Sequence, residues 1–157
     1  MKASSRAWEF LGLVAVTVIG AVLIPIESWI YGTGTISVTG VRIPTFIRDM
    51  FTPSALIVFA ISVIFAMLWW AVATFKFYSA HPRGDSTAKL IWWLFALAPV
   101  LSIGVALYFY GKISPQAVPS MAVFLVFNML LNYWLATAVS TPSLIAHVVP
   151  LARLWRK

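Results

Sequence analysis

The sequence contains no cysteine and only four acidic residues. Without cysteine the chain forms no disulfide, no thiolate metal site and no redox-active thiol pair. The four carboxylates are scattered over different predicted loops and depths, which is a poor basis for a paired-carboxylate or metal–carboxylate site. They belong to Glu9, Glu27, Asp49 and Asp85. We therefore predict no enzyme activity, no catalytic residue, no metal and no cofactor.

Histidine is also scarce, because the chain has only His81 and His147. Neither has a second histidine at helical spacing inside an apolar run, which argues against bis-histidine haem ligation in the bilayer. Neither has an acidic partner at a useful spacing, which argues against a serine–histidine catalytic arrangement.

Apolar residues, by contrast, dominate the chain. Of its 157 residues 62% are hydrophobic and 10% are charged, and the mean hydropathy is +0.95. Soluble domains are about half apolar and about a quarter charged. A chain of this size buries only about two-thirds of its unfolded surface, so a soluble core would not hide such long apolar runs. The composition predicts an all-α membrane protein.

Four segments have the length and apolarity of transmembrane helices. The first has a basic start like that of a signal peptide, but its apolar run is about 20 residues long and no small-residue cleavage site follows. Thr52 is predicted as N-cap and Pro53 as first residue of the second helix. We expect a single polytopic domain, a four-transmembrane-helix bundle over residues 1–157. The predicted spans are residues 8–30, 53–78, 90–110 and 119–139.

The positive charges are distributed unequally between the two sides of this bundle. Translocation of lysine and arginine is disfavoured, so the richer side is predicted to be cytoplasmic, with both termini on it, in a bacterial inner membrane. The net charge of +7 suits anionic lipid head groups at that face better than nucleic acid. The richer side carries Lys2, Arg6, Lys76, Arg83, Lys89, Arg153, Arg156 and Lys157, and the other carries Arg42, Arg48 and Lys112.

The outer loop, residues 31–52, divides into two halves with different periods. Residues 32–40 alternate polar and apolar side chains between glycines, as in a short strand. Residues 43–51 have apolar side chains on one helical face, which predicts a short amphipathic helix lying in the outer interface. This helix either anchors the loop or docks another subunit. For the second case the predicted contacts are Arg42, Phe46, Arg48 and Asp49.

The C-terminal segment, residues 140–157, repeats this pattern on the other side. Its apolar residues are interleaved with basic ones, which predicts a basic amphipathic segment on the cytoplasmic surface, broken or kinked at Pro150. It serves either as an anchor to anionic lipids or as a contact for a partner, through Arg153 and Trp155.

Ionisable and amide side chains inside a membrane are costly, so each needs a role. Glu27 lies near the outer end of the first span, where it could brace the loop, pair with Arg42 or Arg48, or bind a proton or cation. Asn128 and Asn132 are four residues apart and share a helix face, which must meet protein or water and not lipid. They form interhelical hydrogen bonds or line a polar pathway.

Small residues mark a further surface for helix packing. Gly12 and Gly20, with Ala15 between them, would let another helix approach the first span closely. This face serves the bundle itself or another subunit.

The sequence thus favours a non-catalytic integral inner-membrane subunit or scaffold of a larger complex. Export, conjugative or secretion, and energy-conserving assemblies all fit this role. One alternative is a small homo-oligomeric channel or transporter that uses Glu27, Asn128 and Asn132 for its pathway. A second is a membrane immunity or exclusion protein that acts through the outer loop.

Overall fold

The computed structural model describes residues 3–77 and 84–155, and the described part is helical with no strand. Tyr78, predicted to end the second span, and His81 lie outside the described residues. Four helical runs are long and apolar enough to cross a membrane. The prediction of an all-helical chain with four such helices is confirmed. The runs are Arg6–Gly32, Ile43–Phe75, Ser86–Gly111 and Pro115–Ser140.

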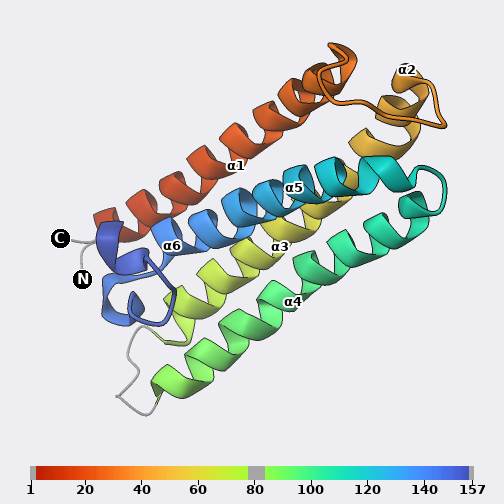
Figure 1. Ribbon diagram of the computed structural model, residues 1–157. Coiled ribbons are helices and arrows are strands. Elements are labelled where there is room, and N and C mark those ends of the chain that lie inside the picture. The colour runs from red at the N-terminus through yellow and green to blue at the C-terminus, as the bar shows by residue number, and fades with distance from the viewer. Residues whose placement is uncertain (1–2, 78–83, 156–157) are drawn as a thin grey trace.

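The helices lie side by side as an elongated bundle (Figure 1). Helix α1 covers Ala3–Gly32, α3 covers Thr52–Phe75 and α4 covers Gly84–Gly111. The fourth run consists of α5 (Val118–Met129), the π-helical turn η3 (Leu130–Leu135) and α6 (Ala136–Ser140). Helix α3 contacts α1, α4 and α5, so it is the central helix. The start of α1 and the C-terminal segment share one end, the terminal end, and the 33–42 loop lies at the other, the loop end.

The outward surface of the bundle is apolar along its length. More than half of the side-chain surface is exposed on Val18 of α1, Ile57 of α3, Leu101 of α4 and Val123 of α5. An apolar surface that runs the length of the bundle is compatible with the hydrocarbon core of a bilayer.

Two apolar clusters fill the interior, one at each end. The cluster at the loop end is centred on Tyr31, Phe51 and Leu125. The cluster at the terminal end is centred on Trp69, Trp92 and Tyr133. Aromatic rings therefore supply much of the buried volume at both ends.

The outer loop differs from its prediction. Residues 33–42 form turns and irregular chain, not a strand. Helix α2 (Ile43–Phe46) leads through the π-helical turn η1 (Ile47–Phe51) directly into α3, so no separate helix precedes the second span. Thr52 is consequently inside a continuous helical run, and its side chain forms no N-cap hydrogen bond. The apolar face turns inward because Phe46 and Phe51 both pack on the ring of Tyr31.

The C-terminal segment is folded onto the bundle. Its described part, residues 141–155, contains two short 3₁₀ turns, Ser143–Ile145 and Ala152–Trp155, and Pro150 lies in the non-helical stretch between them. Ile145, Val148, Val149 and Ala152 are buried in the core at the terminal end. Two tryptophans tie the segment down, since Trp69 Nε1 donates to Thr141 Oγ1 at 2.9 Å and Trp134 Nε1 donates to the Pro150 carbonyl at 2.9 Å.

Candidate functional site

Glu27, Asn128 and Asn132 meet inside the bundle, between α1 and the fourth helical run, and we call these three residues the polar seam. Glu27 on α1 is 3% exposed and Asn128 on α5 is fully buried. The Asn128 Nδ2 atom donates a hydrogen bond of 2.6 Å to Glu27 Oε2. Both side chains are buried in the bundle, where each provides a hydrogen-bond partner that an apolar interior would not provide.

Asn132 extends the polar seam by one helical turn beyond Asn128, toward the terminal end. It is fully buried in the π-helical turn η3, where the backbone N–H bonds reach five residues back in place of four. Its Nδ2 donates to the Asn128 carbonyl at 2.9 Å. The Asn132 side chain thereby holds the backbone that carries Asn128.

A glycine of α1 makes room for Asn132. A Cβ atom placed at Gly20 would lie 1.9 Å from Asn132 Oδ1, so only glycine allows this approach. A Cβ at Gly12 would lie 3.4 Å from Val139 Cγ2. Both ends of the small-residue face of α1 are therefore used within the chain's own bundle.

The seam contains no ion pair among the described residues. Arg48, one of the two cations expected to reach Glu27, pairs with Asp49 instead, with Nε 2.6 Å from Oδ1 and Nη2 2.9 Å from Oδ2. Arg42 is exposed. Because Glu27, Asn128 and Asn132 all face the interior of one chain, a pathway formed between copies would not be lined by them.

The residues predicted for partner binding fall into two environments. Arg42, Arg48 and Asp49 are exposed at the loop end, and Arg153 is exposed at the terminal end. Phe46 is 1% exposed and packs on Tyr31 within the chain's own core. The helical run into α3 turns the Phe46 ring inward, so the predicted contact of this ring with a partner stays a prediction that would require the ring to leave the core. Trp155 is the last residue of its 3₁₀ turn.

A groove between α3 and α4 was not anticipated from the sequence. It has a volume of about 410 Å³ and opens on the outward surface. Three small residues spaced four apart on α4 lie in one wall, beside the larger Leu101, Val105, Phe109 and Tyr110. That spacing is the sequence signal for the groove, and it was not used in the prediction. The α3 wall is formed by Ser54, Ile57 and Ile61, and the α4 wall includes Ala98, Ser102 and Ala106.

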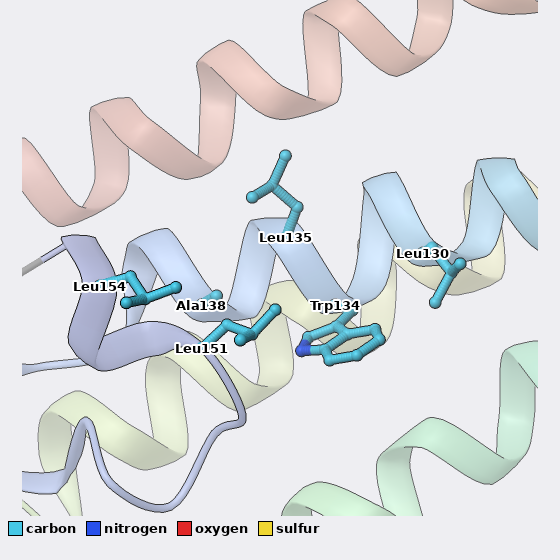
Figure 2. A pocket seen from close by; sticks show the side chains of 6 residues that line it. All are labelled: Leu130, Trp134, Leu135, Ala138, Leu151 and Leu154. Carbon is cyan, nitrogen blue, oxygen red and sulfur yellow. The ribbon is translucent and has the colours of Figure 1, made fainter.

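A smaller apolar pocket of about 230 Å³ lies at the terminal end, between the fourth helical run and the C-terminal segment (Figure 2). Its lining is apolar apart from the Trp134 indole nitrogen, which already bonds to the Pro150 carbonyl. In the sequence, the exposed Arg153 lies between Leu151 and Leu154, which both line the pocket. The lining residues are Leu130, Trp134, Leu135, Ala138, Leu151 and Leu154.

Comparisons with protein-family models, with curated proteins and with solved structures find no match to this chain.

Proposed function

We propose that the protein is a non-catalytic integral membrane subunit whose α3–α4 groove binds a transmembrane helix of a partner protein. The groove is the observation that carries this proposal. It is the largest of the hollows described above, and it lies on the surface that a bilayer would cover.

The chemistry of the groove fits a helix. Inside a bilayer the lipid tails are as apolar as leucine, so helices associate through close packing, and small residues permit that packing. Ala98, Ser102 and Ala106 form such a strip along α4, while Ile57 and Ile61 supply larger side chains opposite. A partner helix with side chains that fill the space between these walls would gain dispersion contacts that disordered lipid does not provide.

Charged residues at the loop end fit the same partner. Ser54 at the loop end of the groove follows Arg48 and Asp49 by less than two turns of the same helical run. A partner helix in the groove would therefore leave the membrane beside this exposed ion pair. Arg42, Arg48 and Asp49 thus remain the proposed polar contacts of the assembly.

The experiment is purification of the native protein in mild detergent, with mass spectrometry of the proteins that accompany it. The variant Ala106→Phe fills the groove, and Val123→Phe adds the same ring at an exposed position of α5. We expect stoichiometric membrane proteins with the wild type and with Val123→Phe, and their loss with Ala106→Phe. The proteins recovered would assign the assembly to the export, conjugative or secretion, or energy-conserving class.

Two results would contradict the proposal. One is a wild-type homo-oligomer that purifies without companions. The other is a set of companions that Ala106→Phe retains in full while its thermal unfolding is unchanged.

A further inference from the structure

The pairing of Glu27 with Asn128 determines the direction in which each polar atom points. A carboxyl oxygen accepts from an N–H, so the Asn128 amide must present Nδ2 to Glu27 Oε2, as the 2.6 Å contact shows. The other atom of each group is then an oxygen. These two oxygens, Glu27 Oε1 and Asn128 Oδ1, have no hydrogen-bond partner among the described residues.

The two oxygens belong to groups that already touch. The two terminal atoms of a carboxyl or amide group are separated by two short bonds, so Oε1 and Oδ1 are on the order of 7 Å apart or less. Both residues are more than nine-tenths buried. A buried carboxylate beside a second unpartnered acceptor oxygen leaves negative charge without compensation, and buried polar groups are rarely left in that state.

The neighbouring side chains supply no positive charge. Helices α2, α3, α5 and α6 contain no lysine, arginine, histidine or acidic residue. In η1 the Arg48 guanidinium is held by Asp49. Tyr31, one turn along α1 from Glu27, donates its hydroxyl to Ser120 Oγ at 3.0 Å. Tyr133 in η3 donates to the carbonyl of Trp92, in the cluster at the terminal end.

We propose that Glu27 and Asn128 bind one small cation, a proton or a monovalent metal ion, between Glu27 Oε1 and Asn128 Oδ1. A proton on Oε1 would be donated to Oδ1, which closes a ring of two antiparallel hydrogen bonds with the Nδ2–Oε2 bond already present. A sodium ion would take the same two oxygens as hard ligands. In both cases one positive charge meets the one carboxylate and no other bond has to break.

Residues around Asn128 hold it in position for this site. The Asn132 side chain fixes the Asn128 carbonyl, and Gly20 leaves the space in which the Asn132 amide lies. The π-helical turn that carries Asn132 begins directly after α5 ends, and such turns are frequent at functional sites. The site is thus held by three helical elements of one chain and does not require a second copy.

The test compares the wild type with Glu27→Gln in lipid nanodiscs. A glutamine forms the same ring with Asn128 through its own N–H group, so it needs no cation. The thermal unfolding temperature Tm is measured in two series, one of pH at constant choline chloride and one in which sodium chloride replaces choline chloride at constant pH. Glu9→Gln is the matched control, because it removes a buried carboxyl at the opposite end of α1.

We expect a Tm that depends on the cation in the wild type and in Glu9→Gln, but not in Glu27→Gln. A ligand that binds only the folded protein should shift Tm by about 3–5 °C per tenfold change in its activity once the site is saturated. A fall of Tm with rising pH identifies a proton, and a rise with sodium identifies the metal ion. An infrared band of a protonated carboxyl that disappears in Glu27→Gln confirms the proton directly.

Equal responses of the wild type and Glu27→Gln in both series would overturn the proposal. Should Glu27→Gln not fold, the same measurements on Glu9→Gln decide the question, because this variant keeps Glu27. If Glu9→Gln shows neither the infrared band of a protonated carboxyl nor a sodium-dependent Tm, the proposal is overturned. The outcome is independent of the α3–α4 groove and hence of the proposed function.

Discussion

Gly20 of α1 and Asn132 of η3 approach so closely that position 20 has no room for a side chain, since a Cβ on Gly20 would fall 1.9 Å from Asn132 Oδ1. The amide has little freedom to move, because its Nδ2 is bonded to the Asn128 carbonyl at 2.9 Å. The contact between α1 and the fourth helical run therefore depends on the absence of one methyl group.

We predict that Gly20→Ala destabilises the bundle by about 1–3 kcal/mol, because overpacking forces the helices apart or breaks the Asn132 hydrogen bond. Gly104→Ala is the matched control, since nothing lies within 4 Å of a Cβ at that helical position. Alanine there should be neutral or stabilising by up to about 1 kcal/mol, because it restricts the unfolded chain. Thermal or denaturant unfolding in detergent checks both. Equal effects of the two variants would show that α1 has more room than the structure indicates.

Phe46 offers a test of the corrected outer region. Truncation to alanine should destabilise the protein by about 3–5 kcal/mol, because the ring is buried against Tyr31 and leaves a cavity. Phe109→Ala removes the same group from a side chain that is 62% exposed, so its cost should be much smaller. Unfolding of the two variants in detergent measures the difference. A Phe46→Ala protein that is as stable as Phe109→Ala but has lost its partner would instead support the docking role predicted for Phe46.

The apolar pocket at the terminal end leads to a prediction about lipids. We propose that it holds an acyl chain of an anionic lipid whose head group is attracted by Arg153, an exposed residue that lies between the lining residues Leu151 and Leu154 in the sequence. A basic residue near a membrane surface contributes about 1 kcal/mol to such attraction, so Arg153→Gln should retain about fivefold less anionic lipid. Native mass spectrometry of the purified protein measures the retained lipid.

The control for this lipid prediction is Lys112→Gln, which removes one exposed positive charge at the loop end. It should leave lipid retention unchanged, because Lys112 lies at the opposite end of the bundle from the pocket. If the two variants lost equal amounts of lipid, the effect would reflect net charge and the pocket would have no specific role.

Some features could be read from particular residues without a structure. The long apolar runs predict four helices because a bilayer needs about 20 apolar residues for each crossing. The sequence also predicted that Asn128 and Asn132 meet protein or water and not lipid, since two amides on one helix face are too costly against lipid. The sequence also identified Glu27 as a residue that needs a role, because an ionisable side chain inside a membrane span is costly.

Other features depended on contacts between segments far apart in the chain. The apolar face of residues 43–51 was compatible with a membrane surface and with a protein core, and only the ring of Tyr31 selects the core for Phe46. The apolar residues of the C-terminal segment were likewise compatible with lipid contact or with burial in the protein. In the structure, the hydrogen bond from Trp134 to the Pro150 carbonyl holds that segment against the bundle.

By itself, then, the sequence determined the membrane class, the number of long helices and the need to hide their polar side chains, because hydropathy and helical period are local properties. The tertiary structure determined which residues of the other helices each buried polar side chain contacts. The Glu27–Asn128 pair, the Gly20–Asn132 approach and the α3–α4 groove each join positions on different helices. Their geometry depends on how the helices pack, which no local pattern specifies.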